Sequence, residues 1–507
     1  MNLTNFPTEP AGSPRDNKPL THLSQLQALL CLLHAPWRRA GGRACRVAGG
    51  QTRRRLENSH HPPTGPSAIQ SRRNREQPGL QAFGLPPQWL ALLAGAALLF
   101  QPPDAGAVAS INQERLVSAN TVFAFKLLKQ LGREHPGTNI FISPYSLSTV
   151  LQLVDNGAKG RTKKQIESVL ETTALDTDAL NRANRLLSQT IKPAPANTTV
   201  LNLANAIWHR KEFSLNPEFV ARNAEFFQAS VEGLDFADPR SVDAVNGWAD
   251  RNTGGKIKRL MDGPFGPLDE VVLANAVYFK GAWASRFDKR NTQPAVFRLQ
   301  NGQEKRVLMM TQHGRFFYHQ AGGGLQAVCL PYTDRNFAMS ILLPAPNSSV
   351  AKVLSRLDAE VWENAIWRKF RDQAIELNLP RFKLEYGVEL KKPLEALGMS
   401  LAFYPRKADF SGMAAEPLFI SRVSQRAAVE VDEQGTEAAA ATVGVLTQGI
   451  TPSVFVDRPF LFLIHHLPTK SILFMGIVYD PEFLGTSGEL DSLKASSTPV
   501  RRRPREF

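Results

Sequence analysis

The chain has 507 residues, of which 43% are hydrophobic, so it can form one large domain or several ordinary ones. Its formal net charge of +14 invites a nucleic-acid-binding interpretation. The excess charge lies at the ends: residues 1–109 carry 12 Lys/Arg and 5 Asp/Glu, and residues 491–507 carry 5 and 2. The remaining 381 residues have a net charge of only +4, which argues against a nucleic-acid partner.

The cysteine content excludes two further classes of protein. Only three cysteines occur, and two of them, Cys31 and Cys45, lie in the N-terminal part, which leaves Cys329 alone in the main body. No disulfide framework and no cysteine-based zinc site can be built from one thiol. We therefore expect no metal and no cofactor, and a domain that is held together by its core.

The N-terminal region has two parts. Residues 1–70 are dominated by Arg, Gly, Pro, Ser and His without a persistent apolar period, which predicts a disordered or mis-annotated extension. In residues 71–109, three arginines precede the apolar stretch Trp89–Phe100, and the small residues Ala105–Ala109 follow. This order is typical of a secretory signal with an A-x-A cleavage site.

The apolar stretch Trp89–Phe100 has 12 residues, whereas a membrane-spanning helix needs about 20. We therefore expect secretion to the extracellular space, or to the periplasm in a bacterium, and no stable membrane insertion. A retained membrane anchor and an apolar patch in a mis-read extension are the alternatives. The next methionine after Met1 is Met261, so a reading frame extended upstream of a non-Met start near residues 70–85 would explain the internal position of the signal.

The central chain has a mixed pattern, with helices first and strands later. Apolar residues recur on one face in Val117–Gly132, Lys163–Leu170 and Ala179–Leu187, which predicts helices. No repeat of 20–50 residues occurs, so a solenoid or a propeller is excluded.

Strands are predicted in the later segments by β-branched residues and alternation. These segments are Val200–Trp208, Val271–Phe279, Ile375–Leu379, Val454–Ile464 and Ile472–Tyr479, and the last two form a hairpin-like pair. The order of elements favours an α+β fold with a large mixed sheet.

A series of short motifs runs in order through this central region. They are Asn139–Ile166, Asn246–Ile257, Tyr278–Trp283, Phe287–Thr292, Val307–Met310, Leu379–Phe382, Leu397–Met399, Ala408–Gly412 and Phe455–Phe460. Each is weak alone, but the complete series in register closely resembles the serpin family of serine protease inhibitors.

The resemblance implies a serpin domain over residues 110–485, with residues 486–507 left as a disordered basic tail. It implies an α+β fold of three β-sheets with eight or nine helices, and an exposed reactive-centre loop before the C-terminal signature. It also implies a monomer whose native state is metastable.

The predicted loop lies within Val431–Val456, and its first part resembles the hinge of inhibitory serpins. The hinge residues are Glu433, Gly435, Thr436, Ala438, Ala439, Ala440, Ala441 and Thr442. Side chains of a strand alternate between faces, so every second residue of an inserted strand must be buried. Counting in twos from Thr436 to Gly444 gives only small, uncharged residues, whereas Glu437 falls on the opposite phase and can stay in water.

Two other properties of the loop favour insertion into a sheet. Gly435 offers the hinge its freedom in φ, and no proline between Glu433 and Thr451 removes a backbone donor. The alternative is a helix, because alanine has the best helix propensity. The flanking Thr-Glu and Thr-Val-Gly-Val make a stable helix a poor fit, so we expect an inhibitory member of the family. A non-inhibitory serpin that acts as a chaperone or carrier is the alternative.

The family mechanism implies an irreversible suicide-substrate inhibitor, not an enzyme, which acts by conformational change. A target serine endopeptidase cuts the loop, becomes covalently acylated to it, and is distorted when the cut loop inserts into the central sheet. A cysteine protease is the alternative target.

Family spacing from Glu433 predicts a reactive bond between Gly449 and Ile450. The following segment is about one residue shorter than usual, so Leu446, Thr447 and Gln448 are neighbouring candidates. Residues 434–457 contain no Lys or Arg. Trypsin-like proteases require a cationic side chain of the substrate for their acidic specificity pocket. Elastase-, subtilisin- or chymotrypsin-like targets are therefore expected.

The resemblance also implies supporting residues around the central sheet. Ser143, Ser146 and Asn246 match the polar cluster called the shutter, in which Gln425 stands where the family often has a histidine. Glutamine can both donate and accept, so the network can persist, although an imidazole that senses pH is lost. Trp283 matches the breach, where insertion begins, and a plain core aromatic is the alternative.

A hydrolase is the rival function from another class. The sequence contains no G-x-S-x-G, no H-E-x-x-H, no C-x-x-C and no P-loop. A storage or structural protein with the same fold is the third hypothesis, and it would have no need for small residues at alternate hinge positions.

Overall fold

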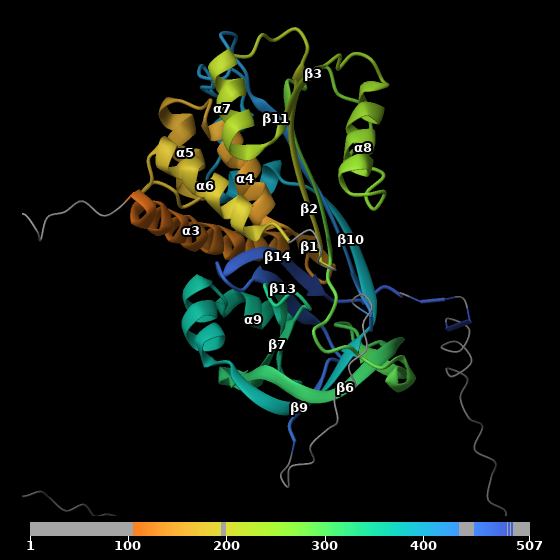
Figure 1. Ribbon diagram of the computed structural model, residues 1–507. Coiled ribbons are helices and arrows are strands. Elements are labelled where there is room, and N and C mark those ends of the chain that lie inside the picture. Colours follow the sequence, from red (N-terminus) through yellow and green to blue (C-terminus); the bar gives the residue numbers. More distant parts are fainter. Residues whose placement is uncertain (1–104, 194–198, 435–450, 484, 487, 490–507) are drawn as a thin grey trace, which may run out of the picture. The chain divides into compact units, whose positions relative to one another are not determined.

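The computed structural model describes residues 105–193, 199–434, 451–483, 485–486 and 488–489 (Figure 1). The predicted extension over residues 1–70, most of the predicted signal segment, and the predicted loop over residues 435–450 lie outside these residues. Within the described part of the chain, no helix is both long and apolar enough to cross a membrane.

The described helices begin early in the chain, as the sequence predicts. They are α3 (Ala105–Glu134), α4 (Pro144–Asp155), α5 (Gly160–Val169), α6 (Thr177–Ile191), α7 (Pro217–Phe227), α8 (Ser241–Asn252), α9 (Val350–Arg356) and α10 (Lys391–Leu397). The three predicted helices are confirmed within α3, α5 and α6. The small residues Ala105–Ala109, predicted as a cleavage site, form the first residues of α3.

One of the two sheets formed by the described residues has five strands. Its strands, in spatial order, are β10 (Phe382–Glu389), β11 (Ile420–Val431), β4 (Val271–Lys280), β2 (Val200–Arg210) and β3 (Ser230–Leu234). The central pair β4–β11 is parallel, whereas both strands pair antiparallel with their outer neighbours. A parallel pair thus lies in the middle of the sheet.

Helices cover both faces of this sheet (Figure 1). On one face, Leu273 and Ile207 belong to the core that includes α4. On the other face, Trp208 packs edge-on against Trp248 of α8, with ring centroids 6.1 Å apart. Because successive strand residues point to opposite faces and both faces are covered, β2 and β4 are mostly apolar.

The remaining strands form a nine-stranded network around the second part of the core. In spatial order they are β1 (Ile140–Ile142), β14 (Ser471–Val478), β13 (Phe460–His466), β8 (Phe337–Leu343), β7 (Leu325–Pro331), β6 (Glu304–Ala321), β9 (Arg371–Pro380) and β12 (Ser453–Phe455), with β5 (Gln293–Arg298) paired to β6. The 18-residue β6 pairs in turn with β5, β9 and β7. This one long strand therefore joins smaller sheets into a single hydrogen-bonded network.

The predicted strand Val454–Ile464 is wrong as a single element. The chain forms β12, which pairs parallel with β9, and then β13, which pairs antiparallel with β14. The break falls between them at Asp457–Pro459, because proline lacks the N–H that a central strand needs and restricts the residue before it. The β13–β14 part of the predicted hairpin is confirmed.

Two adjacent histidines at the end of β13 are buried as neutral groups. The Nε2 of His465 lies 2.9 Å from the hydroxyl of Ser340, and its ring packs edge-on against Trp367. Burial, together with the neighbouring His466, lowers the pKa of His465 to about 3. Burial also lowers the pKa of His466 to about 4, although Asp334 opposes this shift.

These histidines predict a loss of stability in acid. In the unfolded chain each imidazole takes up a proton near pH 6.5, whereas in the folded chain it does so only near pH 3–4. The free energy of unfolding should therefore fall as the pH drops from about 6.5 towards 4. The free energy of unfolding, measured with denaturant at each pH, should depend less steeply on pH for His465→Gln than for wild type, and as steeply as wild type for Gln320→Ala at an exposed position of β6. An identical pH dependence for both variants would contradict the assignment.

Candidate functional site

The site is built around the parallel pair β4–β11, because the predicted loop starts where β11 ends. The described chain continues from β11 to Gln434 and resumes at Thr451, two residues before β12 begins at Ser453. The predicted hinge residues from Gly435 onward and the predicted reactive bond at Gly449–Ile450 lie outside the described residues. Glu433, the first predicted hinge residue, is inside them.

A buried polar cluster ties α4 to β11 beneath the sheet. Ser143 caps the N-terminus of α4, where its hydroxyl accepts a hydrogen bond from the Ser146 amide at 3.2 Å. The Ser143 amide donates to Gln425 Oε1 at 2.9 Å, and Gln425 Nε2 donates back to the Ser143 carbonyl at 3.0 Å. Gln425 thus satisfies a donor and an acceptor of the backbone at once, as its amide allows.

The same cluster extends across the sheet. Asn275 on β4 donates to Ser146 Oγ at 2.6 Å and to Asn205 Oδ1 on β2 at 2.5 Å. Gln425 Nε2 also donates to Asn275 Oδ1, and this bond crosses from β11 to β4. Hydrogen bonds therefore connect α4 with β2, β4 and β11 through four side chains, those of Ser146, Asn205, Asn275 and Gln425. One of these bonds, from Gln425 to Asn275, crosses the parallel pair.

The structure does not bring Asn246 into this cluster. Asn246 lies on α8, and its Oδ1 accepts hydrogen bonds from the amides of Leu260 at 2.7 Å and Met261 at 2.9 Å. These bonds fix the turn that follows α8, on the opposite face of the sheet from Ser143. Asn275 occupies the place that the resemblance assigned to Asn246.

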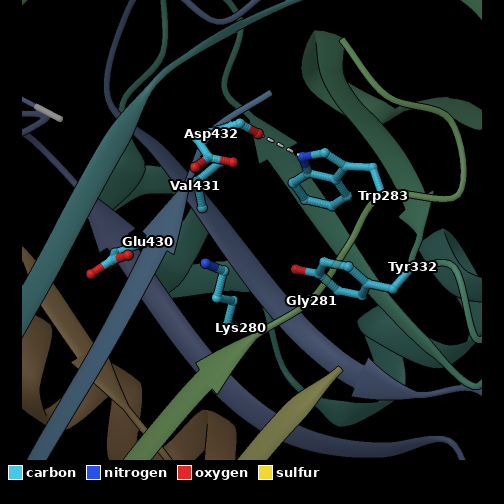
Figure 2. Close-up of a pocket in the computed structure, with 7 residues that line it drawn as sticks. All are labelled: Lys280, Gly281, Trp283, Tyr332, Glu430, Val431 and Asp432. Carbon is cyan, nitrogen blue, oxygen red and sulfur yellow. Dashed lines mark hydrogen bonds between the residues drawn. The ribbon is translucent and has the colours of Figure 1, made fainter. Parts of the chain in front are cut away.

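Trp283 closes the end of the parallel pair. Its indole N–H donates to the carbonyl of Asp432, just beyond β11, at 2.9 Å (Figure 2). The ring is buried and stacks on Tyr332, with centroids 4.7 Å apart and an interplanar angle of 11°. A small cavity remains beside these rings between Lys280 and Glu430, which lie at the ends of β4 and β11 (Figure 2).

Glu433 is only 2% exposed, and its carboxylate has two partners. Its Oε1 accepts a hydrogen bond from Thr292 Oγ1 at 2.5 Å and forms an ion pair with the Nη2 of Arg381. A buried carboxylate is tolerated only with such partners, because burial alone disfavours its charge. The first hinge residue is thus anchored to the body of the domain.

Sequence reasoning missed four residues of this site: Asn205, Asn275, Thr292 and Arg381. A signal for two of them exists, because β2 and β4 both contain the sequence Leu-Ala-Asn-Ala, and asparagine is unfavourable in the middle of an apolar strand. The two asparagines are direct partners in the antiparallel register. Arg381 and Thr292 belong to quoted motifs, but their pairing with Glu433 depends on contacts across more than fifty residues.

No group of three or more His, Cys, Asp or Glu side chains that could hold a metal occurs among the residues with assigned positions.

Comparison with known proteins identifies relatives over this same part of the chain. The family model described as Serpin (serine protease inhibitor) matches residues 118–481. The chain is 36% identical to the leukocyte elastase inhibitor of Bos taurus over 381 residues, which cover 73% of this chain and 100% of the relative. It is 34% identical to the glia-derived nexin of Rattus norvegicus, with 73% and 94% covered.

Solved structures give the same result. Native protease nexin-1 crystallised with heparin superposes with a TM-score of 0.67 at 30% identity, which covers 73% of this chain and all of that one. Mouse protein-Z dependent protease inhibitor superposes with a TM-score of 0.68 at 26% identity, over 75% of this chain and all of that one.

The polar cluster predicts a specific effect of its central glutamine. Gln425→Ala would leave the Ser143 amide and carbonyl and the side-chain Oδ1 of Asn275 without this partner in a buried place, which costs about 1–3 kcal/mol. Denaturant unfolding should show a loss of this size. Gln320→Ala, at an exposed position of β6, should change stability by less than about 0.5 kcal/mol. Equal effects of the two variants would show that the cluster adds no stability.

Proposed function

The chain belongs to the serpin family, and we propose that it is an inhibitory member that traps a serine protease by inserting its cut loop between β4 and β11. The observation that carries this proposal is the parallel pair in the middle of the five-stranded sheet. A chain that leaves β11 at Val431 and turns back runs antiparallel to β11. Because β4 is parallel to β11, the returning chain is antiparallel to β4 as well.

Insertion therefore replaces one parallel contact by two antiparallel ones, which are slightly more stable per residue. The side chains of every second residue would be buried on one face of the sheet, against the core that includes α4. The hinge composition fits this requirement, because Thr436, Ala438, Ala440 and Thr442 are small and uncharged. An uncut loop is tied at both ends, by Glu433 and by β12, and this tether opposes insertion.

The proposed reaction follows the chemistry of the protease. The serine hydroxyl of the protease attacks the carbonyl carbon of Gly449, an ester bond forms, and the bond to Ile450 breaks. The departing Ile450 nitrogen takes up the proton and becomes a new N-terminus. Insertion then carries the ester-linked protease away before water can hydrolyse the ester, so this chain supplies no catalytic residue.

The choice of protease follows from the loop sequence. Residues 446–450 are Leu, Thr, Gln, Gly and Ile, which are small, polar or apolar and carry no charge. An acidic specificity pocket would leave its own charge unpaired against them. Elastase-, subtilisin- or chymotrypsin-like enzymes are the proposed targets, with cysteine proteases second.

The N-terminal segment supports a proposal of export. Basic residues, the apolar stretch Trp89–Phe100 and the small residues Ala105–Ala109 have the order of a cleaved signal. Sequencing of the N-terminus of protein collected outside producing cells should find it at about residue 110. A protein retained in the cells with residues 71–109 intact would refute export.

A protease panel tests the inhibitory mechanism. Incubation of residues 105–507 with elastase, subtilisin, chymotrypsin and trypsin should yield, on denaturing gels, a stable band at the summed mass with one of the first three enzymes. Thr436→Arg places a charge at a position that must be buried, so we expect cleavage with at least a tenfold loss of the complex band. Glu437→Arg, one residue further on the solvent phase, should retain complex formation.

Two outcomes would contradict this account. Equal complex formation by both arginine variants would show that alternate residues need not be buried. Cleavage without complex across the panel, with no rise in the unfolding temperature of the cut protein, would favour a non-inhibitory chaperone or carrier.

A further inference from the structure

The chain continues beyond the part that matches the family and returns to the site. The family match ends at residue 481, and the next residue, Glu482, forms an isolated antiparallel bridge with Lys383 of β10. The segment therefore runs along the edge of the five-stranded sheet at the end where β11 leads into the loop. The sequence predicted a disordered tail from residue 486 onward.

A local capping arrangement orders Glu489 within that segment. The amide of Thr486 donates to Glu489 Oε2 at 2.7 Å, and the Glu489 amide donates back to Thr486 Oγ1 at 3.4 Å. This reciprocal pattern of Thr-x-x-Glu is a capping box. The hydrogen bond from Thr486, followed by the effect of Arg381, lowers the pKa of Glu489, so its carboxylate is favoured.

The other carboxylate oxygen of Glu489 faces Arg381. The Nη1 of Arg381 lies 3.0 Å from Glu489 Oε1, while Nη2 of the same guanidinium binds Glu433. The Arg381 side chain is only 8% exposed, and that of Glu489 is 37% exposed. The two carboxylates use different nitrogens, so they do not compete, and together they fix the plane of the guanidinium.

Glu433 ties the start of the loop to the body of the domain. It lies two residues beyond β11, and its carboxylate accepts from Arg381, which immediately precedes β10, and from Thr292, which immediately precedes β5. Entry of the following residues beside β11 would therefore have to draw Glu433 away from these partners.

We propose that Glu489 is a positioning residue for loop insertion: by holding Arg381 against Glu433, it keeps the start of the loop tied to the body of the domain until the loop is cut. The proposal rests on the insertion mechanism above. Glu489 lies beyond residue 481, where the family match ends. Its role would be to set the rate at which the uncut protein converts by itself into a loop-inserted form.

The test compares three full-length variants of the secreted or purified chain. Glu489→Gln removes the charge, Glu489→Asp retains it, and Glu482→Gln removes an exposed charge from the same segment as a control. Each uncut protein is held at a mildly elevated temperature, and the growth of a species that resists thermal unfolding is followed with time. Unfolding temperatures of the uncut and loop-cut forms are measured for each.

We expect Glu489→Gln to convert about fivefold faster than wild type, as one partly exposed ion pair allows, and to lower the unfolding temperature of the uncut form only. Glu489→Asp should restore at least part of the wild-type rate, and Glu482→Gln should match wild type. Equal rates for all variants, equal effects of the two glutamine variants, or an equal loss of stability in the uncut and cut forms would overturn the proposal.

Failure of the inhibitory mechanism would be seen separately. If wild type forms no covalent complex with any protease and shows no gain in stability after cutting, the proposed function fails before the variants are compared. If wild type does both and the variants do not differ, only the role of Glu489 fails.

Discussion

The parallel contact between β4 and β11 is the constraint on which the site depends. Three side-chain interactions lie along this contact. The Gln425–Asn275 bond lies in its middle, and the bond from Trp283 to Asp432 lies at its end. The bond from Thr292 to Glu433 lies just beyond that end. All are polar bonds inside a largely apolar surrounding. Such bonds specify one arrangement strongly, yet each can re-form with a new partner once a strand enters.

Under the proposed mechanism the same sheet must be closed before the cut and open after it. The apolar faces of β4 pack on the cores that include α4 and α8. Opening would be opposed by the hydrogen bonds between β4 and β11, each worth about 1 kcal/mol net, and by the tethering of the loop at both ends. Cutting would remove the tether and leave only the bonds.

The sequence predicted the α+β class, the early helices and most later strands, because their apolar periods are clear. Ordered motifs predicted the family and drew attention to Ser143, Gln425 and Trp283, whose contacts lie at the parallel pair. Asn246 matches a quoted motif but bonds the amides of Leu260 and Met261 on the other face of the sheet, and the sequence motif does not reveal that face. The contact between Arg381 and Glu489 depends on tertiary structure and leaves no local pattern.

Backbone hydrogen exchange, measured on the protein before and after a single cut in the loop, tests the central claim most directly. If the loop inserts between β4 and β11, the amides of residues 436–442 should exchange at least a hundredfold more slowly after the cut, because they join a central ladder. The amides of β4 and β11 should remain protected. Loop amides that exchange equally fast before and after the cut would show that no strand has entered the sheet, and would contradict the account.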